Sequence, residues 1–133
     1  MALEGYKSNH NVVYSSKYHC VWTPKYRRAV LVGPSAKRCE QVIRQVADKY
    51  RAEIMALEIM PDHVHVLVEV DPQLGIHRLV KHLKGVSSHS LRQEFRTLKS
   101  RLPTLWTNSY FVSTVGGVPL AVIQPYVESQ KNV

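Results

Sequence analysis

The clearest pattern in the chain is the alternation of valine with other, mostly polar residues between residues 63 and 70. Successive side chains of a strand point to opposite faces, so the alternation predicts a strand with two different faces. One face carries only valine and is expected to be buried beneath helices; the other carries two imidazoles that project together. The valine face holds Val64, Val66, Val68 and Val70, and the opposite face holds His63, His65, Leu67 and Glu69.

A second apolar run, residues 53–60, precedes this strand, and Pro61-Asp62 between the two runs predicts a hairpin turn. Residues 12–23 are rich in β-branched and aromatic residues and stop at Pro24, as a strand does. Residues 105–115 have the same character, and Gly116-Gly117 ends them. The chain is therefore expected to contain four strands.

Helical periodicity marks two longer segments. From Ser35 to about Arg51 apolar residues recur every three or four positions, and Ser35, after Pro34, is the expected N-cap. The second segment, about residues 74–98, contains Gly85, which costs roughly 1 kcal/mol relative to alanine and predicts a bend or a division there. Its polar face is strongly basic. That face comprises His77, Arg78, Lys81, Lys84, Arg92, Arg96 and Lys99.

The last segment, from Pro119 to about Lys131, predicts a short helix with proline at its first position. The order of elements is then βαββαβ plus a terminal helix. A four-stranded antiparallel sheet with helices mainly on one face accommodates that order with short connections, so we expect a ferredoxin-like α+β fold. With 133 residues, the chain is expected to form a single domain, residues 1–133.

The charge of the chain indicates an anionic partner. Lysine and arginine number 18 against 10 acidic residues, a net charge of +8. Because the basic residues are spread along the chain, nucleic acid is a better candidate than a membrane surface. Cys20 and Cys39 are too few and too far apart for a disulfide framework or a zinc knuckle. Neither a signal peptide nor a run of about 20 apolar residues is present, which predicts a cytoplasmic protein, nucleoid-associated when bound to DNA.

Candidate chemistry comes from four side chains. Tyr126 and Gln130 are four residues apart, so on a helix they point the same way. If that helix packs beside the strand of His63 and His65, a phenol, an amide oxygen and two imidazoles converge. Such a donor set leaves coordination positions open on a divalent cation for the oxygens of a phosphodiester, and the tyrosine is the natural nucleophile.

Two other classes of function fit the same elements. One is a non-catalytic RNA-binding module, which normally places stacking aromatics on its central strands, whereas residues 63–70 contain none. The other is a small zinc hydrolase, which would need a third protein ligand such as Glu69 or His89.

Several blocks of the sequence, in order, carry a resemblance to a known family. The blocks are Tyr18-His19, Tyr26-Arg27-Arg28, residues 60–69 (MPDHVHVLVE), residues 83–88 (LKGVSS), Trp106, residues 110–117 (YFVSTVGG) and residues 126–130 (YVESQ). In them the chain resembles, almost end to end, the single-tyrosine HUH transposases of the insertion-sequence 200/605 type.

The resemblance implies that His63 and His65 are the HUH histidines and that Gln130 completes a Mg²⁺ or Mn²⁺ site. It further implies that Tyr126 forms a 5′-phosphotyrosine link with single-stranded DNA and releases a 3′-OH. A host-domesticated relative that nicks hairpins without mobilising an element shares these implications. One departure is Pro125, which precedes the tyrosine and predicts a kink there.

The partners implied are single-stranded DNA with imperfect hairpins and a second copy of the chain. In the homodimer, the Tyr126 helix can complete the partner's site, with Gly116-Gly117 as a suitable hinge. The basic residues expected to contact DNA phosphates are Arg27, Arg28, Lys84 and Arg92.

Overall fold

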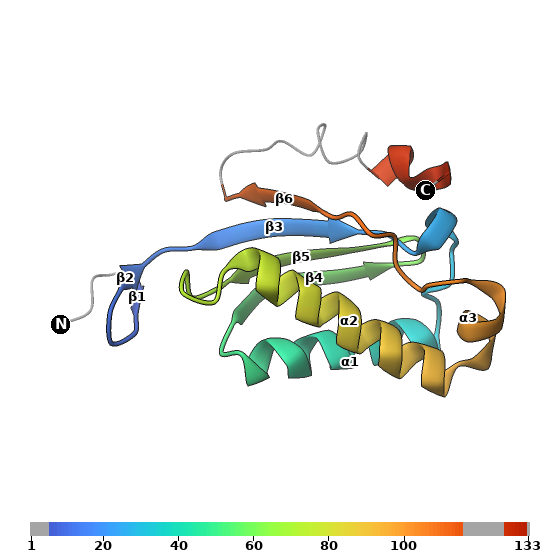
Figure 1. Ribbon diagram of the computed structural model, residues 1–133, viewed down its shortest axis with the longest axis horizontal. Coiled ribbons are helices and arrows are strands. Elements are labelled where there is room, and N and C mark those ends of the chain that lie inside the picture. The colour runs from blue at the N-terminus through green and yellow to red at the C-terminus, as the bar shows by residue number, and fades with distance from the viewer. Residues whose placement is uncertain (1–5, 116–126, 133) are drawn as a thin grey trace.

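The computed structural model describes residues 6–115 and 127–132, and its centre is an antiparallel sheet (Figure 1). The four strands of this sheet lie in the order β4-β5-β3-β6. Helices α1 and α2 lie together on one side of the sheet, and α3 follows α2 (Figure 1). The bounds are β3 Lys17–Trp22, α1 Pro34–Lys49, β4 Glu53–Met60, β5 His63–Glu69, α2 Ile76–Glu94, α3 Arg96–Arg101 and β6 Phe111–Thr114. This arrangement confirms the predicted ferredoxin-like α+β fold.

The valine face of β5 forms the middle of the core. Val64, Val66 and Val68, with Val70 just after the strand, are at most 1% exposed, and they face the apolar sides of α1 and α2. Cys20 and Trp22 of β3, paired with Val66 and Val64, are fully buried in the same layer. Both cysteines are free and buried, as expected for a chain without a disulfide framework. The prediction that the valine face of β5 is buried beneath helices is therefore confirmed.

The turn between β4 and β5 was also predicted correctly. Met60 pairs with His63, so Pro61 and Asp62 alone connect the strands. Asp62 thereby sits at one end of the sheet, next to the first histidine of β5. A bulge between Ile54 and Ala56 shifts the register farther along β4.

Two details predicted for the helices were wrong. Helix α2 runs through Gly85 without a break and ends at Glu94, and the chain leaves the helical conformation only at Phe95 (φ −122°). Glycine lowers helix stability without forcing a bend, and the buried Leu83, Ser87 and Leu91 hold both halves of α2 against the core. The second error concerns the start of α1, whose N-cap is Gly33 (φ +57°) and not Ser35.

Ser35 instead orders the loop that leads into α1. Its hydroxyl accepts a hydrogen bond from the Val32 N–H at 3.2 Å and lies 2.8 Å from the Val30 carbonyl oxygen. Pro34 begins the helix, since the fixed φ of proline suits the first helical position.

Two predicted strands are shorter than expected. Residues 12–23 contain a break between β2 (Val13–Tyr14) and β3, and β2 pairs with β1 (Lys7–Ser8) in a small hairpin that extends beyond the main sheet (Figure 1). Of residues 105–115 only β6 is a regular strand. The stretch before β6 is held by hydrogen bonds that the Lys84 ammonium donates to the carbonyl oxygens of Thr107 and Ser109.

At the C-terminal end, residues 127–129 are helical and lead into the turn η2 (Gln130–Asn132). Figure 1 shows this segment across the sheet from α1 and α2, and η2 contacts η1 (Lys25–Arg27). Tyr126, Pro125, Gly116-Gly117 and the start of the predicted helix lie outside the described residues. None of the helices that the structure describes is long and apolar enough to span a membrane.

Candidate active site

His63 and His65 lie on the open face of β5, opposite the valines, and both are half-buried. His63 Nδ1 is 2.9 Å from Asp62 Oδ1. A carboxylate at this distance orients the imidazole with its proton on Nδ1 and leaves Nε2 free as a ligand atom. Burial raises the pKa of Asp62, but the hydrogen bond from His63 and the charge of Arg27 outweigh this effect and hold the pKa below its usual value. Asp62 is therefore an ionised partner for His63.

Burial lowers the pKa of His65, and the neighbouring His19 and His63 lower it further, against an opposing effect of Glu58. A lowered pKa keeps the imidazole neutral at pH 7. A neutral imidazole has the lone pair that a metal ligand needs.

His19 is a third imidazole at this place, and it was not predicted from the sequence as a site residue. Its Nδ1 lies 3.3 Å from His65 Nε2, and the two ring centroids are 5.5 Å apart. Strand β3 pairs antiparallel with β5, with Val21 opposite His65, so His19 lies diagonally across from His65. The signal in the sequence was that His19 is two residues from Val21 and one from Cys20, so it lies on the face of β3 opposite Cys20 and Trp22. The pairing of β3 with β5 was needed to interpret it.

Gln130 lies in η2 and is 6% exposed. Its Oε1 accepts a hydrogen bond from Ser109 Oγ at 3.1 Å, and its Nε2 donates to Ser129 Oγ at 3.1 Å. The amide oxygen thus faces the segment before β6. Within residues 6–115 and 127–132, no three His, Cys, Asp or Glu side chains cluster as a metal site.

Arg27 connects the segment of Gln130 to the strand end of His63. Its Nε is 2.8 Å from Asp62 Oδ2 and its Nη1 is 3.0 Å from Glu128 Oε1. Nη1 is buried and has no aligned hydrogen bond among the described residues, so its pairing with Glu128 is electrostatic. The backbone at Tyr26 (φ +59°) and Arg27 (φ +49°) is left-handed, which costs about 1–2 kcal/mol per residue.

The other three basic residues predicted to contact DNA have different surroundings. The Lys84 ammonium donates to the carbonyl oxygens of Thr107 at 2.7 Å and Ser109 at 2.9 Å. Burial lowers the pKa of Lys84 to about 8. Arg28 is exposed on the loop after η1, and Arg92 is partly exposed on α2.

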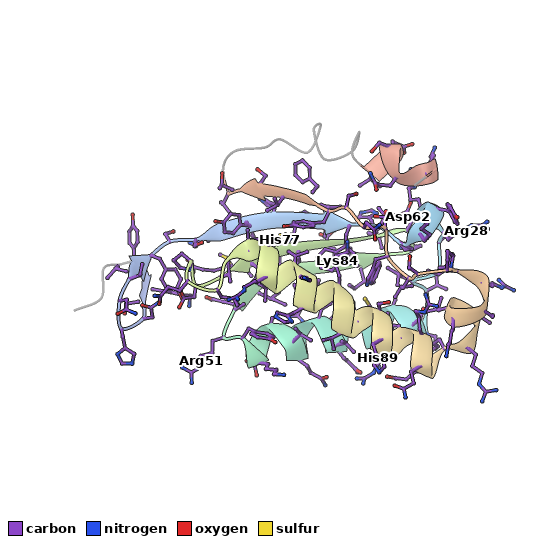
Figure 2. All side chains as sticks on the ribbon, viewed as in Figure 1. Arg28, Arg51, Asp62, His77, Lys84 and His89 are labelled. Atoms are coloured by element: carbon purple, nitrogen blue, oxygen red, sulfur yellow. The ribbon has the colours of Figure 1, made fainter. Side chains whose placement is uncertain are left out.

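Arg92 lines a hollow of about 490 Å³ beside α2, and a neighbouring hollow of about 330 Å³ has Lys84 in its wall. The two share Gly85, Ser88 and Thr104, and we call them together the basic groove. No acidic side chain lines either hollow. Figure 2 shows the side chains of His77, Lys84 and His89 spaced along α2. This surface suits a chain of phosphates better than a small cation.

Neither of the two side chains suggested as third ligand of the alternative zinc site, Glu69 and His89, lies beside the two imidazoles. Glu69 is buried at the far end of β5, where its Oε2 accepts a hydrogen bond from the Ser16 N–H at 3.1 Å. His89 lies on α2, across the sheet from the two imidazoles, and lines the basic groove. Neither side chain reaches His63 or His65.

Comparison with known proteins identifies the family of the chain. The family model described as "Transposase IS200 like" matches residues 12–130. The ISDra2 transposase TnpA of Deinococcus radiodurans is 40% identical over 95% of this chain and 91% of its own length. The transposase for insertion sequence element IS200 of Salmonella typhimurium is 32% identical over 93% of this chain and 82% of its own length.

Two solved structures resemble the fold. A crystal structure of a Deinococcus radiodurans R1 protein named as a transposase has a TM-score of 0.87 and 39% identity, covering 96% of this chain and 99% of that one. A REP-associated tyrosine transposase bound to a REP hairpin has a TM-score of 0.50 at 15% identity, covering 92% of this chain and 69% of that one. The second likeness concerns the fold alone. Since the family match spans nearly all of the sequence, this chain belongs to the IS200-like transposases.

Proposed function

We propose that this transposase binds imperfect hairpins in single-stranded DNA and cleaves and rejoins the strand beside them through a 5′-phosphotyrosine on Tyr126. In the proposal, His63, His65 and Gln130 hold Mg²⁺ or Mn²⁺. The observation that carries it is the pair of imidazoles on the open face of β5, with the segment of Gln130 joined to the same strand end by Arg27. The fold is shared with a tyrosine transposase bound to a REP hairpin, which supports a hairpin as ligand.

The donor set fits a catalytic cation. Two nitrogen donors and one amide oxygen leave positions open for phosphate oxygens, and His65 is kept neutral by burial while His63 is oriented by Asp62. A cation bound there would polarise the phosphorus and offset charge that develops on the phosphate oxygens.

In the covalent steps, bonds form and break only between Tyr126 and the DNA. The Tyr126 oxygen attacks phosphorus and loses its proton, the P–O3′ bond breaks, and the leaving oxygen becomes a 3′-OH. The phosphotyrosine conserves the energy of the broken ester, so a second 3′-OH can attack it, restore a phosphodiester and return the proton to Tyr126. Joining needs no nucleoside triphosphate. Since Tyr126 lies outside the described residues, its role rests on the resemblance and on its spacing before Gln130.

The basic groove is the surface we propose for DNA phosphates. Of the four basic residues predicted to contact DNA, Arg92 in the wall of the groove and Arg28 on the loop after η1 remain accessible, whereas Arg27 and Lys84 have partners within the protein. The net charge of +8 supports the same assignment. A homodimer in which the Tyr126 segment completes the partner's site is part of the proposal.

The test is the formation of a covalent adduct. The protein is incubated with single-stranded DNA that contains a flanking hairpin and Mn²⁺, and denaturing gels separate protein–DNA adducts. Tyr126→Phe should form no adduct, and Tyr6→Phe, at an exposed tyrosine, serves as the matched control. His63→Ala or His65→Ala should also lose cleavage but retain hairpin binding. An adduct with Tyr126→Phe would refute the nucleophile.

Complementation tests the shared site. If the tyrosine segment completes the partner's site, mixed dimers of Tyr126→Phe and His63→Ala protein regain one intact site and therefore cleavage. Inactive mixtures with verified subunit exchange would refute the sharing and leave the nucleophile standing. Rejoining of a second strand end distinguishes a transposase from a domesticated relative that only nicks.

A further inference from the structure

Arg27 lies between two carboxylates that belong to separate parts of the chain. Asp62, 2.8 Å from its Nε, is on the turn between β4 and β5, and Glu128, 3.0 Å from its Nη1, is on the C-terminal segment. The second oxygen of Asp62 contacts His63 Nδ1 at 2.9 Å. Glu128 also pairs with Lys131 at 2.9 Å. A continuous series of contacts, His63–Asp62–Arg27–Glu128, therefore runs from the imidazole to the segment that ends in Gln130.

The backbone around Arg27 is built to hold this side chain in place. The Arg27 N–H donates to the Pro24 carbonyl oxygen at 2.8 Å, and the Lys25 N–H donates to the Leu105 carbonyl oxygen at 2.8 Å. Two successive left-handed residues persist only where their surroundings determine them, and such positions cluster at functional sites. The Arg27 side chain is only 19% exposed. Its guanidinium offers donors in two directions, which a lysine ammonium cannot do in a rigid plane.

We infer that Arg27 is a positioning residue that joins the two parts of the active site. Through Asp62 it keeps the Nε2 of His63 available, and through Glu128 it keeps Gln130 at the same end of the sheet. The inference rests on the proposed function for the roles of His63 and Gln130. It replaces the expectation that Arg27 contacts DNA phosphates.

The two ion pairs of Arg27, which we call its Asp62 arm and its Glu128 arm, differ in their exposure to solvent. Asp62 is 24% exposed, whereas Glu128 is 61% exposed. Solvent and salt screen an exposed ion pair much more than a shielded one, so the Glu128 arm breaks more readily. The C-terminal segment can then leave while Asp62 still orients His63, which is what exchange of that segment between subunits requires.

The first test measures Mn²⁺ affinity of the full-length protein by the EPR signal of free Mn²⁺. Loss of a residue that orients a metal ligand typically weakens binding 10- to 100-fold, so Arg27→Gln and Asp62→Asn should each do so by about that factor. Because both changes break the same arm, the double variant should bind no more weakly than the weaker single variant. Arg44→Gln, at an exposed ion pair on α1, is the matched control and should bind like wild type. Unchanged affinity for Arg27→Gln, or additive losses, would overturn the inference.

The second test needs no metal. In ¹⁵N NMR spectra of metal-free protein, the His63 ring should be mainly protonated on Nδ1, and both Arg27→Gln and Asp62→Asn should shift it toward a mixture of tautomers. Glu128→Gln breaks only the other arm and should leave the His63 tautomer as in wild type, while it weakens Mn²⁺ binding no more than Gln130→Ala does. Glu40→Gln, at an exposed ion pair on α1, is its control.

The two tests separate the inference from the proposed function. If His63→Ala left Mn²⁺ affinity unchanged, the metal assignment would fail, and the tautomer of His63 in Arg27→Gln protein would then decide the role of Arg27. A His63 tautomer that is the same in wild type and Arg27→Gln would sink the inference even if cleavage and metal binding behave as proposed. If Arg27→Gln does not fold, Asp62→Asn tests the same contact between Arg27 and Asp62 without a substitution in η1.

Discussion

Replacing Gly85 with alanine should stabilise the protein. Glycine would be needed at this helical position only if a side chain did not fit there. Gly85 lies in the middle of the continuous helix α2, is exposed, and has no atom within 4 Å of the position that a Cβ would occupy. Alanine therefore meets no clash, and it removes the entropic cost of a helical glycine. The expected gain in the free energy of unfolding is about 0.5–1 kcal/mol.

Gly33 provides a matched control because a Cβ there also meets nothing within 4 Å. The difference is in the backbone, since Gly33 has φ +57° and ψ −126°, a conformation that L-residues strongly disfavour. Gly33→Ala should therefore lower the free energy of unfolding by about 1–3 kcal/mol. The two substitutions make the same chemical change in equally open space and should have opposite signs.

The assay is urea denaturation followed by tryptophan fluorescence. With an m-value on the order of 1.5 kcal/mol per M, Gly85→Ala should raise the midpoint by roughly 0.3–0.7 M. A lower midpoint for Gly85→Ala would mean that α2 needs glycine at this position, and the account of the unbroken helix would be refuted. Equal shifts for the two variants would refute the assignment of the Gly33 effect to its backbone conformation.

Three further outcomes are expected. Ser87→Ala should cost about 1–3 kcal/mol in urea denaturation, because the buried Trp106 Nε1 donates to Ser87 Oγ at 3.0 Å and would lose its acceptor, whereas Ser88→Ala next to it should have little effect. Since the pKa of Lys84 is lowered from 10.5 to about 8, folded protein releases this proton at a lower pH than unfolded protein does. The free energy of unfolding of wild type relative to Lys84→Met should therefore rise between pH 8 and 10.5. A difference that does not vary with pH would contradict the burial of the ammonium. Arg92→Gln should reduce the log–log salt slope of hairpin binding by about 0.7 if it contacts one phosphate of a single strand, and an unchanged slope measured by fluorescence anisotropy would remove it from the DNA surface.

The order of elements and the buried face of the sheet followed from local patterns. The alternation of valines predicted which face of β5 enters the core, because a period of two leaves no other choice. The Pro61-Asp62 turn and the bounds of α1 within a residue or two followed from turn chemistry and helical period. These features depend on residues near one another in the chain, which is why the sequence alone determined them. His63 and His65 came with them, since their positions opposite the valines are part of the same alternation.

Other features depended on contacts between distant residues, and only the tertiary structure decided them. Lys84 and Arg27 were predicted from the sequence to contact DNA phosphates, but Lys84 binds carbonyl oxygens 23 and 25 residues away and Arg27 joins Asp62 to Glu128. His19 reached the site because β3 pairs with β5, a register that no local pattern specifies. Gly85 remained helical because the core on both sides of it outweighs its low propensity. A local pattern assigns a side chain to a face, but its partner across the fold depends on pairing and packing between segments far apart in sequence.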